Sequence, residues 1–127
     1  MVPQRFLQIG LLLLSLFFLE GCDGFLHIRG VVRDTAGKPI PNARVALTHG
    51  EGRKFEDMTD SNGCFSAGGT IAPGRYKYDL RIEANGYIPV IAEIETLANR
   101  NVVVILAREG SSGPSQTKEA DQIPCRE

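Results

Sequence analysis

The chain has no tryptophan and only two histidines, His27 and His49, among its 127 residues. A catalytic zinc ion takes three protein ligands, and the sequence has no histidine–glutamate motif that could supply them. The nucleophile turn Gly-x-Ser-x-Gly and a phosphate-cradling glycine loop are absent too. We therefore expect a protein that is not an enzyme and that has no cofactor and no metal site.

An excess of either charge is also missing. The 14 lysines and arginines nearly balance the 15 aspartates and glutamates, which leaves a net charge of −1, and the two signs are interspersed. Nucleic-acid-binding proteins carry a basic patch or stripe. We expect no nucleic-acid partner.

Long apolar runs are missing except near the N-terminus. One base, Arg5, precedes fourteen mostly apolar residues from Phe6 to Leu19, and the chain continues Glu20-Gly21-Cys22. A membrane-spanning helix needs about 20 residues, whereas a short apolar run that ends at a small residue is typical of a cleaved export signal. We predict that residues 1–21 are a signal peptide.

The pattern Leu-x-Gly-Cys at residues 19–22 resembles the lipobox of bacterial lipoproteins, which are cut before a cysteine that carries diacylglycerol. The resemblance implies that acylated Cys22 anchors the protein in a membrane of the cell envelope, facing the periplasm. Asp23 resembles the signal that retains some lipoproteins in the inner membrane, so that membrane is favoured over the outer one. The alternative is an ordinary signal peptide followed by an incidental cysteine.

Residues 22–108 have the pattern of one all-β domain. Apolar and polar residues alternate with period two, and glycine, proline and asparagine recur at short intervals, which predicts a β-sandwich. The clearest strand, 75–84, has one apolar and one charged face. Expected core side chains on this strand and on strands 26–33 and 43–48 are Tyr76, Tyr78, Leu80, Ile82, Ala84, Leu26, Ile28, Val32, Ala43, Val45 and Leu47.

The segment Asp60-Ser61-Asn62-Gly63 predicts a hairpin turn, because Asn62 and Gly63 tolerate left-handed backbone angles. It should join a strand near 55–59 to one at 64–67. Phe65 would then point into the core and Cys64 outward.

An ordered series of turn and core residues runs through this domain: Ile28-x-Gly30-x-Val32-x-Asp34-x-x-Gly37-x-Pro39-x-x-Asn42-Ala43-x-Val45, then Thr59-Asp60-x-x-Gly63-x-Phe65, Pro73-Gly74-x-Tyr76 and Gly86-Tyr87. Over residues 26–108 the series resembles the carboxypeptidase regulatory-like domain. The resemblance implies a seven-stranded transthyretin-like, or prealbumin-like, sandwich.

In metallocarboxypeptidases this module accompanies a zinc catalytic domain, which has no counterpart in this sequence. The resemblance thus implies a non-catalytic accessory or protein-interaction module. A hydroxyisourate hydrolase of related fold would end in Tyr-Arg-Gly-Ser, whereas this chain ends in Pro124-Cys125-Arg126-Glu127. The alternative function is carbohydrate or small-ligand binding, for which Tyr87 and Phe55 are the candidate exposed aromatic residues.

Two cysteines, Cys64 and Cys125, remain after Cys22 is assigned to the anchor. In an oxidising compartment they can form a disulfide, whose loop would contribute at most about 4 kcal/mol by the chain-entropy estimate. Linkage of Cys125 to a partner, or two free thiols, are the alternatives. Residues 109–127 have no periodic apolar face, so we expect a disordered tail.

The last predicted strand, 102–107, is apolar on both faces, although a two-layer sandwich buries only one face of a strand. Either the tail or a loop covers the second face, or that face contacts a membrane protein or a second copy of the chain. Which parity points outward is left open. The candidate interface residues are Val102, Val103, Val104 and Ile105.

Overall fold

The computed structural model describes residues 24–49, 53–71, 76–96 and 100–126. Every regular element in these ranges is a β-strand, and none of them contains a helix that could cross a membrane. The strands are β1 (Gly24–Asp34), β2 (Arg44–His49), β3 (Arg53–Met58), β4 (Cys64–Ile71), β5 (Tyr76–Glu83), β6 (Val90–Thr96), β7 (Arg100–Leu106) and β8 (Gln116–Ala120).

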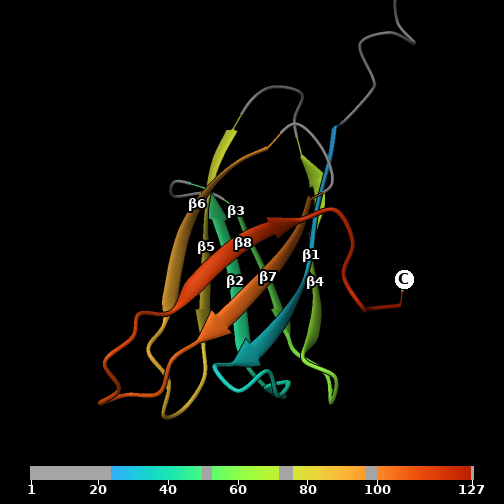
Figure 1. Ribbon diagram of the computed structural model, residues 1–127. Helices are drawn as coiled ribbons and strands as arrows, with labels where there is room; N and C mark the ends of the chain where they lie inside the picture. Colours follow the sequence, from blue (N-terminus) through green and yellow to red (C-terminus); the bar gives the residue numbers. More distant parts are fainter. Residues whose placement is uncertain (1–23, 50–52, 72–75, 97–99, 127) are drawn as a thin grey trace, which may run out of the picture.

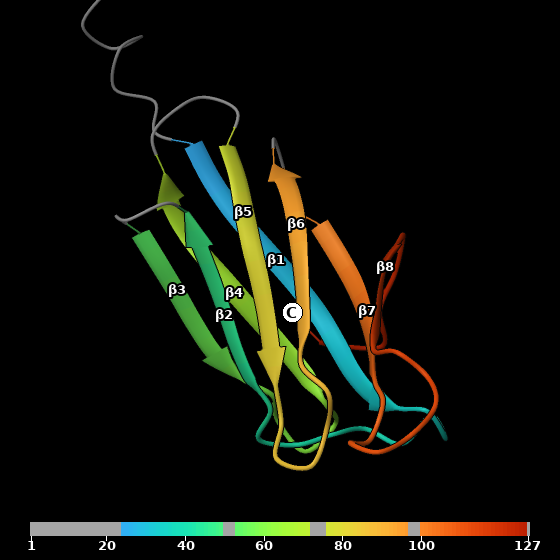
Figure 2. The ribbon, with the colours of Figure 1, turned by 90° about the vertical axis from the view of Figure 1, so that its left-hand side faces the viewer.

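The strands form two four-stranded sheets that pack face to face (Figures 1 and 2). This confirms the prediction of an all-β sandwich. Sheet A has the order β4–β1–β7–β8, and sheet B has the order β3–β2–β5–β6. All neighbouring strands are antiparallel except β1 and β7, which run parallel. Parallel neighbours need a crossover connection, and here the segment of the chain between β1 and β7 contains the four strands of sheet B.

The alternation read from the sequence places the core correctly. The expected side chains of β1, β2 and β5 are buried between the sheets, whereas the charged residues between them on β5 are exposed. The side chain of Tyr76 lies outside the described residues. The core cluster consists of Leu26, Ile28, Val32, Ile40, Ala43, Val45, Leu47, Phe65, Ala67, Tyr78, Leu80, Ile82, Val90, Ile94, Val102, Val104 and Leu106.

Two predictions about connections are wrong. The turn at residues 60–63 does not close a hairpin, because β3 pairs with β2 in sheet B and β4 pairs with β1 in sheet A. The turn therefore carries the chain from one layer to the other. The tail is not disordered either: β8 adds an eighth strand along the edge of β7, paired from Asn101↔Ala120 to Ile105↔Gln116.

The two ends of the sandwich differ in what they carry. At one end β1 begins, with Gly24 opposite Ile71 of β4. The opposite end, which we call the far end, is formed by the connections at 35–43, 59–63, 84–89 and 107–115 (Figure 2). The 11 residues of β1 run most of the way between them, roughly 35 Å at about 3.3 Å per residue.

Candidate functional site

The side chains that carry the family resemblance are engaged in building turns. The Oδ1 atom of Asp60 accepts hydrogen bonds of 2.9 Å from the backbone N–H groups of Asn62 and Cys64. Gly63 closes the same turn with φ 77°, and a side chain there would collide with the carbonyl oxygen of Val32. The acid and the glycine are thus required by the turn itself.

The connection after β1 has the same construction. Asp34 accepts hydrogen bonds of 2.9 Å from the N–H groups of Ala36 and Lys38, and Gly37 takes φ 86°. Pro39 then bridges back to Arg33. In both turns one carboxylate oxygen, Oδ1 of Asp34 or of Asp60, thus caps two backbone N–H groups.

Thr59 is the buried polar residue of the described core, at 3% exposure. Its hydroxyl donates to the carbonyl oxygen of Ile40 at 2.7 Å and accepts from the N–H of Ala43 at 2.8 Å. Its backbone forms two further hydrogen bonds of 3.0 Å, with Asn42 and Ala43. One threonine thereby holds the segment 40–43 in place.

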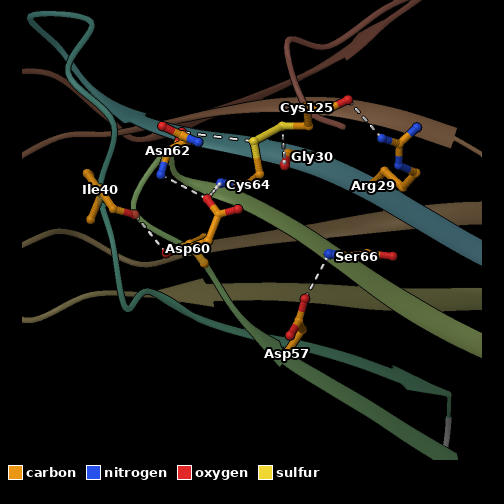
Figure 3. Close-up of a disulfide and its surroundings, with 10 residues drawn as sticks. Arg29, Gly30, Ile40, Asp57, Asp60, Asn62, Cys64, Ser66 and Cys125 are labelled. Carbon is orange, nitrogen blue, oxygen red and sulfur yellow. Dashed lines mark hydrogen bonds between the residues drawn. A yellow bond between two sulfur atoms is a disulfide. The ribbon is translucent and has the colours of Figure 1, made fainter. Parts of the chain in front are cut away.

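Cys64 and Cys125 form a disulfide, with a Cα–Cα distance of 5.9 Å (Figure 3). This is one of the three arrangements that the sequence left open. After β8 the chain returns across the outer face of sheet A, where Asn101 Nδ2 donates to the Asp121 carbonyl at 3.1 Å. Arg29 Nη2 then donates to the Cys125 carbonyl at 3.0 Å. Residues 121–126 are thus attached to three of the four strands of sheet A.

This returning segment explains the burial of Val31. Val31 alternates with the core residues of β1 and so points to the outer face, yet it is only 1% exposed. Its register neighbours on that face are Cys64 of β4 and Val103 of β7. Cys125 is bonded to Cys64 and so lies at the β4 side of this row, next to Val31, whereas Val103 at its other side is only half-buried.

The structure also shows which residues of β7 point into the core and which point to the outer face. Val102 and Val104 belong to the core, so these two residues cannot form the interface that we considered. Val103 and Ile105 point to the outer face and are half-buried. On that face they lie beside Lys118 and Gln116 of β8. The C-terminal segment thus covers part of this face, and Val103 and Ile105 are the residues left for a contact.

The two histidines lie on different sheets and do not converge. His27 Nε2 contacts Ser66 Oγ diagonally across β1 and β4, on the outer face of sheet A. His49 Nδ1 lies 2.9 Å from the Lys77 carbonyl, with its ring 5.0 Å from that of Tyr78. In the described part of the chain no three histidine, cysteine, aspartate or glutamate residues are grouped as metal ligands.

A depression of about 670 Å³ lies on the outer face of sheet B, over β2, β3 and β5. Five of its charged residues form ion pairs: Lys54 with Glu56 at 2.6 Å, and both Arg44 and Arg81 with Glu83. Exposed pairs of this kind contribute little to stability. Lys77, Asp79 and Arg81, on the charged face of β5, are exposed to solvent.

A second pocket, of about 320 Å³, lies at the far end between the connections 35–43 and 84–89. Neither segment was predicted to form a site, although Tyr87 was among the candidate exposed aromatic residues. The other aromatic candidate, Phe55, packs partly buried against the core. The pocket is lined by Pro39, Ile40, Pro41, Asn42, Ala84, Asn85 and Tyr87.

The predicted lipidation and sorting residues, Cys22 and Asp23, lie outside the described residues.

Solved structures with a similar fold include enzymes of two kinds. The 5-hydroxyisourate hydrolase of Klebsiella pneumoniae matches with TM-score 0.56 and 15% identity, over 77% of this chain and 94% of that one. The chlorocatechol 1,2-dioxygenase of Pseudomonas putida matches with TM-score 0.56 and 14% identity, over 68% of this chain and 61% of the enzyme. At such identities the likeness concerns the fold alone.

Comparison with curated protein sequences found no match. The profile of one sequence family does match, over residues 27–109, which is most of the sandwich. The match ends before β8, so the eighth strand and the disulfide-linked segment lie beyond the family's domain. The turn caps at Asp34 and Asp60, the sandwich fold and this match together show that the chain belongs to the carboxypeptidase regulatory-like domain family.

Proposed function

We propose that this protein is a lipid-anchored, non-catalytic accessory or protein-interaction module of the cell envelope. The observation that carries the proposal is that one family domain occupies residues 27–109, while its motif carboxylates cap turns instead of lining a cavity. Motif side chains that are used up in turns hold a rigid surface, which suits a module that binds a partner.

The short spacing between Cys22 and β1 supports an anchored role. β1 begins at Gly24, two residues after Cys22. At about 3.5 Å per residue, an acylated Cys22 holds the sandwich within roughly 15 Å of the membrane surface. Asp23 favours the inner membrane, with the domain facing the periplasm.

The partner in this proposal is a membrane protein or a second copy of the chain. The outer face of β7 offers Val103 and Ile105, which are apolar and half-buried. They lie beside a segment that the disulfide fixes in place, so the surface is preorganised. Preorganised surfaces lose less conformational entropy on binding.

Acylation is tested by the Cys22→Ser variant, grown with an alkyne-bearing palmitate analogue. We expect the label and the membrane pelleting to be lost, because the cysteine thiol carries the acyl chain. The matched control is Cys125→Ser, which should keep the label. Label retained in Cys22→Ser would contradict the anchor, and Asp23→Ser should shift the protein toward outer-membrane fractions.

A further inference from the structure

We propose that the far-end pocket binds a neutral saccharide. The inference goes beyond the accessory role, and it does not require that the chain be acylated. The pocket is lined only by uncharged residues, of which two are side-chain amides, one is a phenol and the others are apolar. A sugar ring presents the matching combination, because hydroxyl groups alternate with apolar C–H faces around it.

The first wall of the pocket, residues 39–42, is held rigidly. The Thr59 hydroxyl binds the carbonyl of Ile40 and the N–H of Ala43, on either side of the lining residues Pro41 and Asn42. Asn42 has φ 59°. Among the residues that the structure describes, no other residue except glycine has a left-handed backbone. This conformation costs of order 1 kcal/mol and persists only where the surroundings impose it.

A second, half-buried hydroxyl holds the opposite wall. Ser115 Oγ donates to the Ile88 carbonyl at 2.6 Å and accepts from the Ala107 N–H at 3.0 Å. Backbone hydrogen bonds from Ile88 to Ala107, at 2.7 Å, and from Glu109 to Gly86, at 3.0 Å, join the same two segments. The site is therefore formed before any ligand arrives, which is typical of small-molecule sites.

The polar groups of the pocket are available to a ligand. Both Asn42 and Asn85 are exposed, and within the described ranges neither side-chain amide has a hydrogen-bond partner. An amide offers acceptor lone pairs and two donors at once. Each can therefore pair with neighbouring hydroxyl groups, which both donate and accept.

Tyr87 supplies the aromatic surface. Its ring is half-buried against the core, and the Arg108 guanidinium lies 5.8 Å from the ring centroid. Tyr87 and Arg108 also form a backbone bridge, which fixes the ring relative to the pocket.

A proline-rich or extended peptide fits this pocket less well. Grooves for proline-rich peptides are lined by several aromatic residues, whereas the lining of this pocket contains a single one, Tyr87. Strand addition needs a free sheet edge, whereas both walls are connections held by their own hydrogen bonds. If the chain is anchored through Cys22, the pocket lies at the end of the sandwich opposite the anchored end, separated from it by the length of β1.

The test uses the full-length Cys22→Ser chain in micelles of a detergent without a sugar headgroup. Saturation-transfer NMR is recorded with maltose, cellobiose and N,N′-diacetylchitobiose, and in parallel with a proline-rich peptide. We expect transfer to at least one disaccharide and a Kd raised at least tenfold by Tyr87→Ala. Asn42→Gly, which suits the left-handed backbone, and Asn85→Ala should weaken binding without disturbing the core.

Ile91→Asn on sheet B is the matched control and should leave the Kd unchanged, because Ile91 is 65% exposed and lies outside the pocket lining. Absence of transfer to all three disaccharides would overturn the proposal, as would binding insensitive to all three pocket variants. Binding of the peptide alone would overturn it as well. Failure of the acylation test would leave these results unaffected, so the two proposals fail separately.

Discussion

The ring of Phe65 on β4 lies over Gly30 on the neighbouring strand β1. A β-carbon on residue 30 would collide with the Cε1 and Cζ atoms of Phe65, and it would lie 2.8 Å from Cγ2 of Val102. These residues are paired in register across sheet A. The absence of a side chain at Gly30 is therefore what allows the largest residue of β4 to enter the core.

We expect Phe65→Ala to lower the free energy of unfolding by about 3–5 kcal/mol, because it empties the space over Gly30. Gly30→Ala should cost about 1–3 kcal/mol through overpacking. The two losses should not add in the double variant, since the alanine at 30 then occupies space left by the ring. Chemical denaturation measures all three, and strictly additive losses would show that the two residues do not contact.

Thr59→Val should destabilise the domain by about 1–3 kcal/mol, because the carbonyl of Ile40 and the N–H of Ala43 lose a buried partner. Thr59→Ser keeps the hydroxyl and is the matched control, with a smaller loss expected. Urea denaturation gives both values. Equal midpoints for the two variants would mean that the hydroxyl contributes nothing.

The disulfide should stabilise the fold by at most about 4 kcal/mol, since it closes a loop with a sequence separation of 61. The double variant Cys64→Ser, Cys125→Ser should unfold at lower denaturant concentration than the parent. Reductant should bring the parent to the midpoint of the variant and leave the variant unchanged. If reductant left the denaturation midpoint of the parent unchanged, the disulfide would not be stabilising.

Single aspartates on β7 should separate the two faces of the strand. Val102→Asp and Val104→Asp place a charge in the core and should unfold the domain. Val103→Asp and Ile105→Asp lie on the outer face and should leave it folded, but should change its association state if this face is the interface. Circular dichroism reports folding and sedimentation velocity reports association. Folded variants that associate as the parent does would remove β7 as an interaction surface.

Local sequence patterns were sufficient to predict the buried faces of β1, β2 and β5 and the position of the turn at Asp60, but not which strands that turn joins. Burial of Tyr78, Leu80 and Ile82 follows from a period-two pattern along one strand. The turn at Asp60 depends on atoms no more than four residues apart, in which one carboxylate caps two N–H groups. Interactions between residues this close in the sequence depend only on a short stretch of the chain, so they could be predicted.

The role of the C-terminal segment and the position of the far-end pocket depend on contacts between residues that are distant along the chain. The strand 116–120 is polar and joins sheet A along the edge of β7, an edge that exists only once β7 has paired with β1. After β8 the chain returns across sheet A, which brings Cys125 within bonding distance of Cys64. The pocket likewise combines residues 39–42 with 84–87, whose walls are held by Thr59 and Ser115 from elsewhere in the chain. Because these contacts join residues that are far apart in the sequence, they could not be predicted from the pattern of neighbouring residues.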